Sequence, residues 1–134
     1  MSIVFLDPSE GERIREAVNR DPEFRLASRY MTRDFLLEAG SVKCIIQVRE
    51  GVITEIKLNP TPYDSWSFFI RGPVESWENF LQTVPPPFYN GVYAGMIRGK
   101  FEVGGDLEAA FDHYWAVARM LEAMREIQNT KKEG

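Results

Sequence analysis

Few residues of this chain have the types and spacing that chemistry requires. His113 is the only histidine and Cys44 the only cysteine among 134 residues. A single cysteine excludes an intramolecular disulfide, and a single cysteine with a single histidine excludes a His/Cys metal cluster built by one chain. A triad with His113 as base would also need a nucleophile and an orienting acid, but there is no G-x-S-x-G motif, and the adjacent Asp112 would point elsewhere on a helix. We expect His113 to be a partly exposed helix residue and Cys44, on the apolar side of a strand pattern, to be a buried small hydrophobe.

Glycine-rich segments and acidic pairs give no better candidate. Residues 95–99, Gly-Met-Ile-Arg-Gly, lack the lysine and the serine or threonine of a phosphate-binding loop. Residues 104–106, Gly-Gly-Asp, precede a predicted helix, but Asp106 would occupy its N-cap and repel an anion. Glu10 and Glu12 are placed as charges near a helix N-terminus. We expect no catalytic residue, no metal site and no cofactor, and we do not expect an enzyme.

Composition and charge exclude further classes of protein. Sixteen basic and 20 acidic residues give a formal charge of −4, which argues against a nucleic-acid partner and against strong docking on anionic lipid headgroups. No run approaches about 18 apolar residues, so we expect no integral membrane association. Residues 1–7 lack the basic region and the long apolar region of a secretory signal. The expectation is a cytoplasmic protein of one domain.

The N-terminal residues have the signals of two short helices. Ser9 and Glu12 have the spacing of a capping box. Asp21 can cap a second helix, with Pro22 at its first position. These signals predict a helical extension before the first strand.

The pattern then changes to strands. Residues 32–58 alternate apolar and polar types around a turn at Glu50-Gly51, which predicts three strands in an antiparallel meander. Residues 65–71 and 98–103 predict two more strands, separated by short helices, and Asp106 begins a long helix. The predicted organisation is a single domain over residues 1–134, with a helical extension at about 8–31, sheet and helices at 32–127 and a frayed tail at 128–134.

The last predicted helix carries two apolar strips. The first should cover the sheet and consists of Leu107, Ala110, Phe111, Tyr114, Ala118 and Leu121. The second consists of Ala109, Ala116, Met120, Ala123 and Ile127. One helix cannot press both strips onto the same sheet. The second strip therefore contacts a second copy, giving a homodimer, or the N-terminal helices of the same chain, unless its alanines are ordinary surface residues.

Aromatic residues concentrate in one stretch of the chain. Nine of the 17 aromatic residues lie between Tyr63 and Tyr93. Rigid rings in short irregular helices can leave an apolar pocket, and a Tyr hydroxyl or Trp N–H can orient a polar head group there. A well-filled aromatic core explains the same spacing, so the pattern leaves both interpretations open.

The order of the predicted elements resembles the sterol carrier protein 2 superfamily. Three segments carry the resemblance: residues 52–56 after the tight turn, residues 68–72 leading into a helix with Trp77 and Leu81, and residues 93–106, where Gly-Lys, alternating apolar residues and Gly-Asp precede a helix. The similarity covers roughly residues 24–125. It implies an α/β (α+β) fold with a five-stranded, mostly antiparallel mixed sheet covered on one face by helices.

The resemblance also implies a hydrophobic tunnel that takes a lipid, a fatty acyl group or a sterol-like ligand. The function expected from it is binding of an apolar small molecule in a carrier or accessory role. The alternative is an accessory subunit that acts through contacts with a second copy or a partner enzyme, without a lipid. The candidate lining residues are Trp77, Phe80, Leu81, Phe88, Tyr89, Val92, Tyr93, Met96, Phe111, Tyr114 and Trp115.

Overall fold

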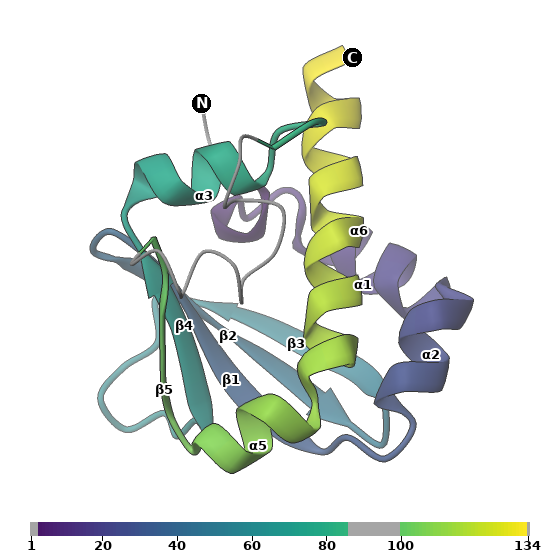
Figure 1. The fold of residues 1–134 in the computed structure, drawn as a ribbon, viewed down its shortest axis with the longest axis vertical. Helices are drawn as coiled ribbons and strands as arrows, with labels where there is room; N and C mark the ends of the chain where they lie inside the picture. The colour runs from purple at the N-terminus through teal and green to yellow at the C-terminus, as the bar shows by residue number, and fades with distance from the viewer. Residues whose placement is uncertain (1–2, 86–99, 134) are drawn as a thin grey trace.

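A five-stranded mixed sheet forms the centre of the computed structural model, which describes residues 3–85 and 100–133 (Figure 1). Its strand order is β3-β2-β1-β4-β5. Only β1 and β4 pair in parallel, and the other neighbours are antiparallel. The predicted fold class is therefore confirmed. The strands are β1 (Arg33–Ala39), β2 (Val42–Arg49), β3 (Val52–Leu58), β4 (Phe68–Gly72) and β5 (Glu102–Gly105).

The predicted meander is confirmed, and its second turn depends on a glycine. Glu50 and Gly51 both have positive φ, at 49° and 80°, between the paired residues Arg49 and Val52. Positive φ at both central residues is the geometry of a type I′ hairpin turn. A Cβ on Gly51 would lie 2.8 Å from the carbonyl oxygen of Ser28, so glycine also permits this close approach. The buried Ser28 hydroxyl donates to the Gly51 carbonyl at 2.9 Å.

The helical segments are η1 (Val4–Leu6), α1 (Gly11–Arg20), α2 (Pro22–Ser28), α3 (Val74–Phe80), α5 (Leu107–Asp112) and α6 (Tyr114–Glu133). The predicted cap of α2 is confirmed, because the Asp21 carboxylate accepts from the Phe24 N–H at 3.0 Å. The predicted capping box at Ser9 is wrong. The Ser9 hydroxyl donates instead to Asp7 at 2.7 Å, and α1 begins only at Gly11.

The C-terminal helix is divided in two, which the sequence did not predict. Asp106 caps α5 as predicted, accepting from the Ala109 N–H at 3.0 Å. The helix breaks at His113, where φ is −107° and ψ is 19°. The two parts pack on different surfaces: α5 lies on β4 and β5, whereas α6 packs mainly on α2, α1 and η1. The second part also extends beyond Ile127, to Glu133.

The second apolar strip of the C-terminal helix is covered within the chain. Ala116, Met120, Ala123 and Ile127 are buried, on a helix that packs against α2, α1 and η1. The Val4 N–H donates to the buried Gln128 side chain at 2.8 Å, which joins the two ends of the chain. The N-terminal helices are therefore the partner of this strip, and the homodimer expected through it is not supported.

The opposite face of the sheet is covered by a loop instead of helices. A small apolar cluster of Leu36, Ile45 and Phe69 lies there. The connection from β3 to β4 crosses this face, because Lys57, the cross-strand partner of Ile45, bonds to Asp64 of the connection at 2.6 Å. Among residues 3–85 and 100–133, the helices thus lie on one face of the sheet, as the fold class predicts.

The outer edge of β3 is closed by a side chain. The Asn19 amide donates to the Ile53 carbonyl at 2.9 Å and accepts from the Ile53 N–H at 2.8 Å. The amide therefore makes the two hydrogen bonds that a further strand would make at that residue. This protects an exposed edge against pairing with other chains.

Replacing Ala116 by glutamate should destabilise the chain without changing its mass in solution. Ala116 is 1% exposed, so the variant would bury a carboxylate beside α2. An unpaired buried charge of this kind costs about 3 kcal/mol or more. Chemical denaturation measures the loss and sedimentation measures the mass. Ala27→Glu, at an exposed position of α2, is the matched control and should change little. A parent dimer that becomes a stable monomer in Ala116→Glu would contradict the internal packing.

Candidate functional site

An aromatic cluster fills the space between the sheet and the helices beside α3. Trp77 is its centre and packs edge-on against Phe5, Phe80 and Phe101, with ring centroids 4.9, 6.0 and 4.8 Å away. Phe80 and Phe101 also meet edge-on at 5.7 Å. All four rings are buried. Such edge-to-face pairs are favourable beyond the apolar area that they remove from water.

Local structure at the end of β4 positions this cluster. Gly72 ends β4, and Pro73 then serves as the N-cap residue of α3. A Cβ on Gly72 would lie 2.8 Å from the Phe101 ring, so the glycine leaves the space that the ring occupies. The Trp77 indole N–H donates to the Glu38 carbonyl at 2.8 Å, which satisfies its one polar group and fixes the ring on β1.

Two residues that sequence reasoning missed hold α3 in place from α6. The Arg125 Nε donates to the Phe80 carbonyl at 2.8 Å, and the Asn129 amide donates to the Leu81 carbonyl at 2.9 Å. These are carbonyls at the C-terminal end of α3, which have no partner within their own helix. The Arg125 guanidinium also lies 4.6 Å from the centre of the Phe80 ring. The four-residue spacing of Arg125 and Asn129, on one face of a helix, was the available signal.

The candidate lining residues fall into three groups. Trp77 and Phe80 of α3 and Leu81 at its C-cap are all buried. Phe111, Tyr114 and Trp115 lie at the junction of α5 and α6, at the opposite end of the sheet from α3 (Figure 1). Phe111 is 49% exposed and Trp115 76% exposed. The remaining candidates lie outside the residues that the structure describes: Phe88, Tyr89, Val92, Tyr93 and Met96. A lining shared by all three groups stays a prediction.

The exposed aromatic group adjoins a surface groove. The groove has a volume of about 360 Å³ and runs between α2 and the start of α6. Leu26, Tyr30 and Trp115 line it and are largely exposed. Its rim carries both signs of charge, from Arg29, Glu23 and Asp112. This groove lies on the surface and is separate from the buried aromatic cluster.

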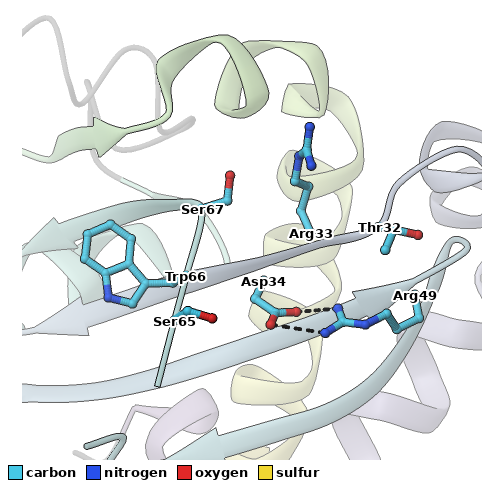
Figure 2. Close-up of a pocket in the computed structure, with 7 residues that line it drawn as sticks. All are labelled: Thr32, Arg33, Asp34, Arg49, Ser65, Trp66 and Ser67. Carbon is cyan, nitrogen blue, oxygen red and sulfur yellow. Dashed lines mark hydrogen bonds and ion pairs between the residues drawn. The ribbon is translucent and has the colours of Figure 1, made fainter. Parts of the chain in front are cut away.

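A second concavity is polar and lies at the start of β1 (Figure 2). Its volume is about 420 Å³. Asp34 and Arg49 form an ion pair in it, and Figure 2 shows Arg33 pointing away from that pair. The other lining residues offer hydroxyls and one indole: Thr32, Ser65, Ser67 and Trp66. These groups could bind water or a small polar molecule.

The two residues with the strongest intrinsic reactivity are in unreactive surroundings. Cys44 is fully buried, as predicted, and burial raises the pKa of its thiol to about 12. A thiol with this pKa is protonated at neutral pH and is a poor nucleophile. Burial, and then the charge of Arg33, lowers the pKa of His113. Within residues 3–85 and 100–133, no group of three or more His, Cys, Asp or Glu could hold a metal ion, and no helix could cross a bilayer.

The fold matches solved structures of sterol carrier proteins. The crystal structure of sterol carrier protein 2 aligns with a TM-score of 0.69 at 15% sequence identity, over 86% of this chain and 92% of that one. This chain has the sterol carrier protein 2 fold. A protein from Thermus thermophilus, described as possibly a sterol carrier protein, aligns with a TM-score of 0.62 at 16% identity, over 87% of both chains.

A third match is the solution structure of palmitated sterol carrier protein 2-like 2 from Aedes aegypti. Its TM-score is 0.51 at 18% identity, over 86% of this chain and 95% of that one. No protein-family model and no curated protein matches the sequence. The resemblance inferred from the order of the elements is therefore confirmed at the level of the fold.

His113 should make the chain less stable as the pH falls from about 7 to 5. Its folded-state pKa lies below the ordinary value of 6.5, so the unfolded chain binds more protons in this range. The free energy of unfolding therefore falls as the pH falls through 6.5. His113→Gln should remove this part of the pH dependence, which chemical denaturation at pH 7.5 and 5.5 measures. An equal loss of stability in the variant and the parent would contradict this assignment.

Proposed function

We propose that the chain binds an apolar small molecule, such as a lipid or fatty acyl chain, between its sheet and its helices. The role would be to carry or present that molecule. The observation that carries the proposal is the sterol carrier protein 2 fold, together with a buried aromatic cluster beside α3. Trp77, Phe80 and Leu81 would form the described part of the lining.

The palmitated relative supports this choice of ligand class. The solution structure of palmitated sterol carrier protein 2-like 2 is the structure of a protein of this fold together with palmitate. Transfer of each methylene from water to an apolar interior contributes about 0.8 kcal/mol, so ten buried methylenes would contribute about 8 kcal/mol. That is comparable to the free energy of micromolar binding. A cavity lined mainly by apolar groups would therefore be sufficient.

A binding role also agrees with the state of the reactive side chains. The Cys44 thiol is buried and protonated. Among the described residues, no hydroxyl or thiol forms a hydrogen bond with the His113 side chain. Catalysis by either residue would need a partner placed within hydrogen-bond reach. A carrier needs none, since its free energy comes from burial of the ligand.

Binding should change the fluorescence of Trp77. The protein has three tryptophans, but Trp77 alone is fully buried, and Trp66 and Trp115 are exposed. A Trp66→Phe, Trp115→Phe variant would therefore report on the aromatic cluster only. Titration with palmitate or cholesterol should change its emission saturably, with about one ligand bound per chain. The same ligands should displace an apolar dye from the parent protein.

Two controls make the titration decisive. Methyl-β-cyclodextrin should remove the ligand and restore the original emission, which separates binding from loss of structure. Circular dichroism of the variant should match that of the parent. Unchanged Trp77 emission together with no dye displacement by either ligand would contradict the proposal. It would favour the accessory role through protein contacts, for which the exposed Leu26, Tyr30 and Trp115 would be the first surface to test.

A further inference from the structure

Arg125 is half-buried and has one guanidinium nitrogen that no described residue pairs. Its Nε donates a hydrogen bond to the Phe80 carbonyl, and its guanidinium faces the Phe80 ring. Its Nη2 is shielded from solvent and has no hydrogen-bond partner among the described residues. No described carboxylate forms an ion pair with it. Burial accordingly lowers the pKa of Arg125, and the charge of Glu122 partly opposes this.

Arg119, six residues earlier on α6, shows how the same side chain is normally satisfied. Its guanidinium contacts Asp21 and, at 3.7, 3.0 and 3.9 Å, Glu23, Glu122 and Glu126. Hydrogen bonding to Asp21 raises its pKa. A shielded N–H without an acceptor is costly, more so when the group is charged. The contrast indicates that the acceptor for Arg125 comes from outside the described chain.

We propose that Arg125 binds the carboxylate of a single-chain lipid whose hydrocarbon chain packs with the aromatic cluster beside α3. This inference rests on the proposed function and makes it specific, because it selects an acidic lipid over a neutral one. The guanidinium has N–H groups in a rigid planar fork, and a carboxylate presents two oxygens that match such a fork. The guanidinium lies over the Phe80 ring, so a carboxylate bound to it would place the first methylenes next to the aromatic cluster.

Asn129 would support this arrangement without contacting the ligand. Its amide nitrogen lies 2.9 Å from the Leu81 carbonyl and 2.7 Å from the Arg125 carbonyl. It therefore fixes the end of α3 relative to Arg125 on the neighbouring turn of α6. The head-group site would thus rest on two helices held together by Arg125 and Asn129.

The test compares dodecanoate with dodecanol, which have equal chain lengths and different head groups. Binding is measured by Trp77 emission and dye displacement at pH 7.5. We expect dodecanoate to bind the parent about 10- to 100-fold more tightly than dodecanol, the range of a charge-assisted hydrogen bond. Arg125→Met should lose that preference, so that the ratio of dodecanoate to dodecanol affinity falls to about one, whatever the loss of its bond to the Phe80 carbonyl does to the affinity for both compounds. Arg125→Lys should retain part of it, because it keeps the charge and loses the fork.

The controls separate this inference from the proposed function. Arg25→Met makes the same change in net charge at an exposed position of α2 and should leave the preference intact. Dodecanol binding by Arg125→Met shows that the variant is folded. The ratio of dodecanoate to dodecanol affinity in the parent protein tests the inference without any variant. Equal binding of acid and alcohol, unchanged by Arg125→Met, would overturn the inference and leave the proposed function standing. Binding of neither compound by the parent would overturn both.

Discussion

The apolar face of the sheet that lies under the helices is the constraint on which the rest of the structure depends. Phe35 and Phe68, on the parallel pair β1 and β4, stack at 5.1 Å near its centre. Their burial requires cover from elements that lie far apart in the chain, because the strands themselves fill the middle of the sequence. The solution is to bring helices from both ends together. The hydrogen bond from Val4 to Gln128 and the ion pair of Asp21 with Arg119 join these ends.

The position of the aromatic cluster follows from this joint cover. The helix α6 is held by α2, α1 and η1, so its C-terminal half is fixed in space. From there Arg125 and Asn129 bind the end of α3. Trp77 of α3 is then tied to β1, because its indole N–H donates to the Glu38 carbonyl. Each step is a specific polar contact that positions apolar groups. Loss of a contact made by α6 would therefore also disturb the position of Trp77.

Features set by neighbouring residues could be predicted from the sequence. The meander, the Glu50-Gly51 turn and the caps at Asp21 and Asp106 depend on alternation, turn chemistry or one side chain and one N–H. The break at His113 could not be predicted, because it arises where the helix passes from the β4 and β5 surface to the α2 surface. The partner of the second apolar strip was ambiguous for a related reason. An apolar strip requires cover, but it does not specify whether that cover is the same chain or another.

The candidate site was predictable only in part. Trp77, Phe80 and Leu81 come from one stretch of aromatic and apolar residues and do lie together. Phe5 and Phe101 join them through tertiary packing from distant segments, which no local pattern encodes. Arg125 was missed because an arginine on a helix has the sequence signature of a solvated surface residue. Its significance appears only in the shielded Nη2 beside Phe80, which no described residue pairs.

The central claim is that this fold encloses an apolar molecule. Native mass spectrometry of the purified chain tests it most directly, because the technique detects a noncovalent ligand without a label or a variant. The account predicts a species heavier than the 15.4 kDa chain by the mass of one lipid, either as purified or after incubation with palmitate, and lost on denaturation. A spectrum showing only the bare chain under both conditions, with its native charge states preserved, would contradict it.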